Sequence, residues 1–293
     1  MSISSDSTSV KLSLPNGDSA SIAFLGATVH SYIHNKIERF FVSSKSSLNG
    51  PAAIRGGIPI CWPIFGPPDK EDERFNKMKQ HGFARTCKWS LDEQASVGDG
   101  DKAVAVLTLD SSPTTQALYA PTFHLTYTVT LSPTSLLVSL KVLSPSTASS
   151  PLSFQALLHS YLRLPPSILP PTVTAKSLTG LSFVDKVQGG AKGLEDRKEV
   201  LVDGPKGEVD RVYHKAPDAL GLSWSGGEAK VTKENLADVV LWNPGPEKGA
   251  TMGDMEEGGA DRFICLEPGQ VGSYVDLKAG EAWEGSVKYE FTA

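Results

Sequence analysis

The chain has 293 residues, of which 27 are glycine and 20 are proline, about 16% together against an average near 12%. With 40% hydrophobic and 21% charged residues the composition is that of a folded globular protein and excludes a largely disordered chain. The formal net charge is -5 and no basic cluster is present, so nucleic acid and anionic membrane surfaces are excluded as expected partners.

The first predicted strands are short apolar runs at residues 8–14 and 20–25, and residues 1–7 before them are expected to be flexible. The next segment, residues 49–85, contains ten glycines or prolines in 37 residues and has no clear strand pattern. A segment this long without regular structure is usually functional or disordered. Its apolar residues exclude a solvated linker and predict an ordered loop packed on a sheet; they are Ile54, Ile58, Ile60, Trp62, Ile64 and Phe65.

The clearest strand pattern lies in the middle of the chain, after a shorter run at residues 102–109. Residues 122–131 alternate strictly between apolar side chains and threonine or histidine, which is typical of a half-buried antiparallel strand. A turn at residues 132–134 leads into a second alternating run at 135–143, so the pair is predicted to form a hairpin. The same alternation continues at residues 152–158.

Further short runs follow at residues 238–242, 262–267, 270–277 and 286–292. Helical periodicity over more than two turns is absent, and strands do not alternate with helices. Many short strands with turn residues between them are typical of antiparallel sandwiches. The sequence therefore predicts an all-β chain that forms a single-domain antiparallel β-sandwich over residues 1–293.

The cysteines and the absence of several motifs limit where the protein is expected to be found and which classes of function it is expected to have. Cys61, Cys87 and Cys265 are odd in number and scattered, which favours reduced thiols in a cytoplasmic protein. No stretch reaches the ~18 apolar residues that span a bilayer, and the amino terminus has no apolar run of signal-peptide length, so we expect a soluble, unexported protein. Nucleotide, dinucleotide, zinc and serine-hydrolase motifs are absent. No metal is expected at His30 and His34, which are predicted to be half-exposed strand histidines.

Two ionisable residues stand in apolar surroundings. His159 follows the predicted strand 152–158, where such a histidine is either a hydrogen-bonded core residue or an acid-base catalyst. Glu267 ends the apolar run 263–266 and is followed by Pro268 and Gly269. It is either a carboxylate that stabilises the turn or a base at the edge of a cleft.

Arg55 and Arg85 bracket the loop of residues 49–85. Two guanidinium groups that converge on one point suit a phosphate or carboxylate, because their planar donor groups form paired hydrogen bonds. The alternative is that the arginines form separate salt bridges with acidic residues of the same loop, Asp69, Glu71 or Asp72.

Six motifs, in this order along the chain, resemble those of the hexose-6-phosphate mutarotases, also called glucose-6-phosphate 1-epimerases, of the aldose 1-epimerase superfamily. They are RGGIPICWPIFGPP, QHGFAR, HSYLR, EVDRVY, VLWNPG and CLEPG. The similarity extends from about residue 20 to the C-terminus. The resemblance implies a galactose-mutarotase-like β-sandwich with the sugar bound in a cleft on one concave sheet.

The resemblance also implies roles for seven residues. His159 corresponds to the general acid of the family and Glu267 to its general base. Asp210 in EVDRVY corresponds to the aspartate that holds sugar hydroxyls, with Asp203, seven residues earlier, as the alternative. The remaining matches are substrate and phosphate contacts, namely Arg55, Gln80, His81 and Arg85.

The reaction implied by the resemblance is the interconversion of the α and β anomers of hexose 6-phosphates, glucose 6-phosphate foremost, by a cytoplasmic monomer. One base removes the proton of the C1 hydroxyl while one acid protonates the ring oxygen, so neither a metal nor an organic cofactor is required. Trp62, Phe65 and Phe83 are expected either as an apolar wall for the sugar or as core. Two alternatives stay open: a noncatalytic sugar-binding sandwich and an epimerase for unphosphorylated aldoses.

Overall fold

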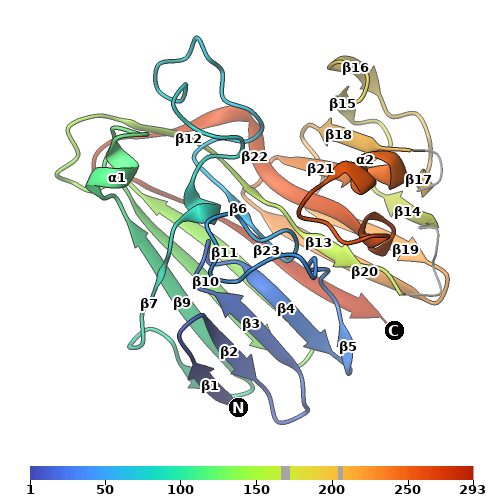
Figure 1. The fold of residues 1–293 in the computed structure, drawn as a ribbon, viewed down its shortest axis with the longest axis horizontal. Coiled ribbons are helices and arrows are strands. Elements are labelled where there is room, and N and C mark those ends of the chain that lie inside the picture. The colour runs from blue at the N-terminus through green and yellow to red at the C-terminus, as the bar shows by residue number, and fades with distance from the viewer. Residues whose placement is uncertain (166–171, 204–206, 293) are drawn as a thin grey trace.

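The computed structural model describes residues 1–165, 172–203 and 207–292. Within these ranges the strands form three sheets in which neighbouring strands run antiparallel (Figure 1). The predicted all-β antiparallel class is thereby confirmed. Of the helices in the described ranges, none has the length and apolar content needed to cross a bilayer.

The first sheet is a meander of five strands in chain order: β1 (Ser2–Ser5), β2 (Ser9–Ser13), β3 (Ser19–Ala23), β4 (Val29–His34) and β5 (Ile37–Glu38). Strand β1 lies where the sequence predicted a flexible terminus. The Asp6 carboxylate accepts hydrogen bonds from the backbone amides of Thr8 (2.7 Å) and Ser9 (2.8 Å). These bonds close a tight turn that places residues 2–5 beside β2.

Among the described residues, the second sheet has the most strands. Its strands are β7 (Ser90–Leu91), β8 (Gly98–Asp99), β9 (Lys102–Asp110), β10 (His124–Ser132), β11 (Ser135–Leu143), β14 (Thr172–Lys176), β17 (Val200–Asp203), β19 (Ala219–Trp224), β20 (Gly227–Glu234) and β23 (Ala282–Thr292). The predicted hairpin is present as β10 and β11, which turn at the pair Ser132 and Ser135.

The third sheet carries the candidate active site. Its strands are β6 (Ile60–Cys61), β12 (Leu152–Leu158), β13 (Tyr161–Arg163), β15 (Ser182–Asp185), β16 (Ala191–Leu194), β18 (Val209–Tyr213), β21 (Asp238–Asn243) and β22 (Phe263–Leu277). Strand β22 replaces two strands that the sequence predicted separately, because Pro268 and Gly269 continue the pairing with β21.

In the part of the chain that the structure describes, helical structure is confined to short connections. These are α1 (Pro113–Gln116), α2 (Gly245–Thr251) and the 3-10 turns η1 (Ala84–Thr86) and η3 (Gly259–Arg262). As predicted, the loop of residues 49–85 is packed on the protein, since Ile58, Ile60 and Trp62 are fully buried.

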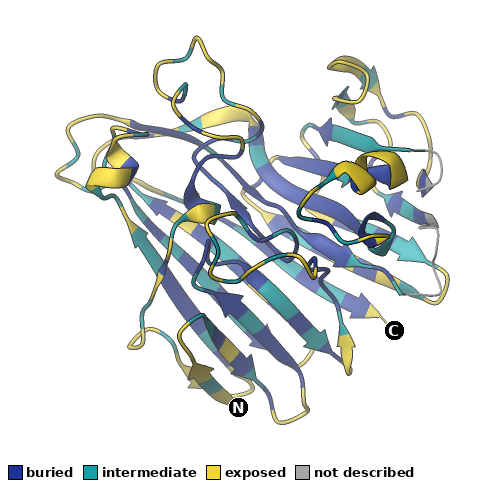
Figure 2. Cartoon of the chain, viewed as in Figure 1, coloured by how far each residue is buried: buried dark blue, intermediate teal, exposed yellow. Residues whose placement is uncertain are grey.

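The main apolar core combines residues of all three sheets, including Val10 of β2, Val138 of β11 and Ile264 of β22. Buried residues lie mainly along the strands, whereas the connecting loops carry most of the exposed residues (Figure 2). Because successive side chains of a strand point to opposite faces, Cys265 and Glu267 lie on the face opposite Ile264.

Candidate active site

One cavity of about 290 Å³ brings together all seven residues that the resemblance singled out. They reach it from the loop of residues 49–85 and from three strands or strand ends that are distant in sequence. The residues that line the cavity are Arg55, Phe65, Gln80, His81, Arg85, His159, Lys186, Asp210, Val240, Trp242, Lys248, Met252 and Glu267.

His159 occupies the short connection between β12 and β13. Its backbone amide donates to the carbonyl of Pro59 (3.0 Å), which fixes the connection on the loop of residues 49–85. The imidazole stacks on the ring of Tyr161, with centroids 4.8 Å apart, and meets the indole of Trp242 edge-on. The ring therefore has one fixed orientation, and only 7% of the residue is exposed.

Glu267 projects from the middle of β22, where it pairs with Val240 of β21. It is 1% exposed, and its Oε1 lies 3.3 Å from Nδ1 of His159. The sequence placed this carboxylate at a strand end, but the strand continues for ten residues beyond it. Glu267 is therefore held by a sheet rather than by a turn, and the interpretation as a turn-stabilising carboxylate is wrong.

Burial shifts the pKa of both groups toward their neutral forms. Burial raises the pKa of Glu267 well above its ordinary value, and Asp210 adds to this effect while Lys186 opposes it. Burial also lowers the pKa of His159 well below its ordinary value, with further lowering by His81 and the nearby arginines. Two buried groups this close titrate together, and burial favours the neutral imidazole beside the protonated carboxyl.

Arg55 is held by residues outside its own loop. Its Nε donates to Oδ2 of Asp254 (3.0 Å) and its Nη1 donates to the hydroxyl of Tyr161 (3.1 Å). Asp72 pairs instead with Arg74. The alternative that Arg55 forms a salt bridge with an acidic residue of its own loop is thus wrong.

The segment from Gln80 to Arg85 brings three of its side chains to the cavity through a sharp bend. His81 and Gly82 both have positive φ, 65° and 69°. The guanidinium of Arg85 donates to the carbonyl of Gln80 (2.9 Å), and the amide of Gly66 donates to Nδ1 of His81 (3.1 Å). Burial and neighbouring cations lower the pKa of His81 to about 2, so this imidazole is neutral at working pH.

Asp210 lies on β18 with its side chain 20% exposed, and its Oδ1 is 3.6 Å from Nζ of Lys186. Burial raises the pKa of this carboxyl, an effect that Lys186 partly offsets. The alternative residue, Asp203, pairs its backbone with Thr172 in the second sheet, and its side chain lies outside the described residues.

Several lining residues were not anticipated. Lys186 and Lys248 add two cations, and Lys186 lies 4.0 Å from the centroid of the Phe65 ring. Lys186 directly follows β15 and belongs to none of the quoted motifs. Trp242 was part of the quoted motif VLWNPG but received no role.

The three aromatic residues expected either as an apolar wall or as core fall into two groups. Phe65 lines the cavity, whereas Trp62 and Phe83 belong to the main core. Phe65 thus remains available as a wall for a sugar, and the other two are structural.

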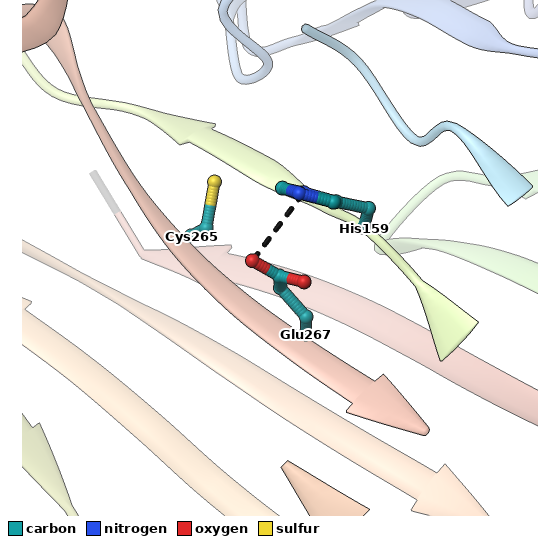
Figure 3. A group of neighbouring side chains, drawn as sticks. All are labelled: His159, Cys265 and Glu267. Carbon is teal, nitrogen blue, oxygen red and sulfur yellow. Dashed lines mark ion pairs between the residues drawn. The ribbon is translucent and has the colours of Figure 1, made fainter. Parts of the chain in front are cut away.

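A thiol lies beside the acid-base pair. His159, Cys265 and Glu267 are all buried, and one potential ligand atom of each lies within 4.8 Å of the others. Cys265 and Glu267 project from the same face of β22 toward the His159 ring (Figure 3). The sequence analysis counted Cys265 among three scattered thiols and quoted it as the first residue of the motif CLEPG, but gave it no role.

The comparison with known proteins agrees with this geometry. The family model described as aldose 1-epimerase matches residues 8–290. A protein of Cenchrus ciliaris, provisionally named glucose-6-phosphate 1-epimerase, is 30% identical over 277 residues, covering 92% of this chain and 80% of that protein. A protein of Salmonella typhimurium with the same provisional name is 29% identical over 257 residues, covering 85% of this chain and 78% of that protein.

A solved structure shows the same fold. The crystal structure of a Salmonella typhimurium protein, provisionally described as a mutarotase, has a TM-score of 0.83 to this chain at 24% identity, covering 99% of this chain and 92% of that one. Together with a family match over nearly the whole length, this fold places the protein among isomerases that act on carbohydrates. The chain belongs to the aldose 1-epimerase family.

Proposed function

We propose that this epimerase acts on hexose 6-phosphates, with glucose 6-phosphate as the first substrate to test. The observation that carries the proposal is the composition of the cavity, in which the His159 and Glu267 pair shares about 290 Å³ with four cationic side chains. The cations are Arg55, Arg85, Lys186 and Lys248. The provisional names of two relatives, glucose-6-phosphate 1-epimerase, support the same substrate.

Ring opening requires one base and one acid at the anomeric centre. In the proposed mechanism Glu267 takes the proton of the C1 hydroxyl while His159 gives a proton to the ring oxygen, so the C1 to ring-oxygen bond breaks and an aldehyde forms. After rotation about the C1–C2 bond, the two residues exchange roles and close the ring on the other face. Each positioned group contributes roughly 10²- to 10⁴-fold to the rate.

The proton distribution in the pair fits this exchange of roles. Burial favours the neutral imidazole and the protonated carboxyl. Moving the proton from Glu267 to Nδ1 of His159, across 3.3 Å, yields the carboxylate and the imidazolium that ring opening needs.

The phosphate would bind among the cationic side chains. A guanidinium offers donors in a planar fork that match phosphate oxygens, and the hydrogen bonds of Arg55 and Arg85 within the protein leave part of each fork free. Lys186 and Lys248 add positive charge. In a chain of net charge -5 this local cluster, rather than the overall field, must attract the phosphate.

The remaining lining residues suit a sugar ring. Asp210 accepts hydrogen bonds from sugar hydroxyls in the proposed complex, and Gln80 and the neutral His81 supply further polar contacts. Phe65 and Trp242 offer apolar surface for the C–H face of the ring. Every residue with a proposed role comes from one chain, so we propose that the enzyme acts as a monomer.

Anomer exchange measured on freshly dissolved α-glucose 6-phosphate by polarimetry or exchange NMR tests the proposal. The purified protein should accelerate equilibration well beyond the rate in buffer alone. The same measurement on free glucose, galactose and their 6-phosphates separates this substrate class from unphosphorylated aldoses. Equal acceleration with and without the phosphate would reject the phosphorylated substrate, and a rate equal to that of buffer on every sugar would reject catalysis.

A further inference from the structure

The thiol of Cys265 has no part in the proposed anomer exchange, yet it lies beside the two groups that do. Within the described residues, Oε2 of Glu267 has no hydrogen-bond partner, and Nδ1 of His159 lies 3.3 Å from Oε1 of Glu267 without forming a hydrogen bond, although His159 is only 7% exposed and Glu267 only 1%. Unpartnered polar atoms this deeply buried are rare, because each leaves its desolvation uncompensated. These two atoms belong to side chains that share one space with the Cys265 sulfur (Figure 3).

We propose that His159, Cys265 and Glu267 form a binding site for zinc or another thiophilic divalent cation, and that occupation of this site inhibits the enzyme. The proposed inhibition rests on the proposed acid-base roles of His159 and Glu267, whereas the proposed metal binding does not. Nitrogen, sulfur and carboxylate oxygen are the three donor types that zinc takes in proteins.

The spacing of the donors is close to that of a zinc site. Zinc binds histidine nitrogen and carboxylate oxygen at about 2.0 to 2.2 Å, which places two ligand atoms of a tetrahedron roughly 3.3 Å apart. Nδ1 of His159 and Oε1 of Glu267 already have this separation, 3.3 Å. The Cys265 sulfur lies within 4.8 Å of one ligand atom of each of these side chains, so rotation of the side chains would complete a set of three ligands.

Charge balance favours a divalent ion at this position. When the ion binds, the protons of the Cys265 thiol and of the Glu267 carboxyl pass to solvent, and a thiolate, a carboxylate and a neutral imidazole then neutralise its two positive charges. The cationic side chains of Arg85 and Lys186 act against the ion, and Asp210 acts in its favour. His159 and Glu267 line the cavity, which offers the ion a route to the site.

Occupation would remove both catalytic functions at once. The metal takes the lone pair of His159 Nδ1, which then cannot carry the proton for the ring oxygen. It also takes the carboxylate oxygen of Glu267, which then cannot accept the C1 hydroxyl proton. A bound hexose phosphate and a bound cation should therefore exclude one another.

Cadmium titration of the full chain in chelator-free buffer tests the proposal, because a cadmium thiolate absorbs in the ultraviolet. We expect wild type to bind one Cd²⁺ with this absorption and to lose anomer exchange in parallel. Cys265→Ser and Cys265→Ala should keep their metal-free exchange rate, lack the absorption and require at least about tenfold more Cd²⁺ for inhibition. Zinc should displace cadmium from wild type.

Cys87→Ser is the matched control, because Cys87 is a partly exposed thiol outside the cavity. It should retain both the absorption and the inhibition of wild type. The proposal is overturned if the Cys265 variants bind and respond to Cd²⁺ like wild type, or if the absorption depends on Cys87. If no sugar phosphate is epimerised by any of these proteins, the proposed function fails while the absorption still decides whether the site binds metal.

Discussion

At the scale of single residues, the proposed function depends on His159 and Glu267, whose facing atoms are 3.3 Å apart in a buried setting. We predict that His159→Ala and Glu267→Gln each lower kcat for hexose 6-phosphate exchange by at least about a hundredfold, because each removes one positioned proton donor or acceptor. Circular dichroism should show that both variants remain folded. The surface substitutions His124→Ala and Glu284→Gln should leave kcat unchanged, and near-full activity of either cavity variant would contradict the assigned role.

The protonation state of His159 can be observed directly. Because burial lowers the pKa of this imidazole, the ring should remain neutral in the free enzyme at pH 5.5, where an ordinary histidine of pKa about 6.5 is mostly protonated. Nitrogen-15 NMR of the imidazole, assigned by comparison with His159→Ala, reports the protonation state. Titration of the His159 resonance near pH 6.5 would show that burial does not control this group.

The arginines decide substrate choice in the proposed complex. We expect Arg55→Ala and Arg85→Ala to reduce kcat/KM for glucose 6-phosphate by roughly 10- to 100-fold, the effect of losing a hydrogen bond to a charged group worth about 1.5 to 3 kcal/mol. The value for free glucose should change much less. Arg74→Ala removes a half-exposed guanidinium outside the cavity and serves as the control. Equal losses on both sugars would assign the arginines a structural role instead.

At the scale of elements, the bend at Gly82 directs the loop of residues 49–85 toward the sheet. A side chain on Gly82 would overlap the carbonyl oxygen of Trp62, which also accepts hydrogen bonds from the amides of Phe83 (3.1 Å) and Ala84 (3.3 Å). The Trp62 carbonyl cannot move away from the added side chain without breaking both hydrogen bonds. Gly226 also has positive φ, 88°, but a methyl group added there would meet no other atom within 4 Å.

We therefore predict that Gly82→Ala lowers the free energy of unfolding by about 2 kcal/mol more than Gly226→Ala. Both variants carry the backbone strain of an L-residue at positive φ, and only the first adds a steric overlap. Urea denaturation of the two variants measures the difference. Equal losses would mean that the loop adjusts around the extra methyl group.

Elements were predicted well where alternation dominates and poorly where tertiary contacts decide. The period of two in β10 and β11 indicated the hairpin and its inward faces, because half-burial imposes that period. Strand β22 was divided in two at Pro268, since local propensity marks proline as a stop. Strand β1 was missed because its sequence is polar and its pairing depends on the Asp6 turn.

At the scale of the whole molecule, the net charge of -5 acts against a phosphorylated sugar, whereas the cationic side chains of the cavity act in favour of its binding in the proposed complex. Salt screens charges beyond a Debye length of about 10 Å at 0.1 M, and it also weakens binding at a partly open cationic site. If the local cations dominate, raising ionic strength should increase KM for glucose 6-phosphate several-fold and leave KM for free glucose unchanged. A decrease in KM would show that repulsion by the whole molecule dominates.

The sequence by itself determined the all-β class, the apolar faces of the long strands and the residue types of the site. Strand alternation follows from local backbone geometry, and the motif resemblance named the seven residues that share the cavity. Neither the alternation nor the resemblance gives the distances between these seven residues or the exposed fraction of each side chain.

Only the tertiary structure decided how those residues act on one another. His159 and Glu267 are 108 positions apart, and their 3.3 Å separation arises because β12, β13 and β21 all pair with β22. The fold also brings Lys186, which belongs to none of the quoted motifs, to the cavity, and it places Cys265 beside His159 and Glu267. Burial also set the direction of both pKa shifts, since desolvation depends on every atom packed around a group and not on its neighbours in sequence.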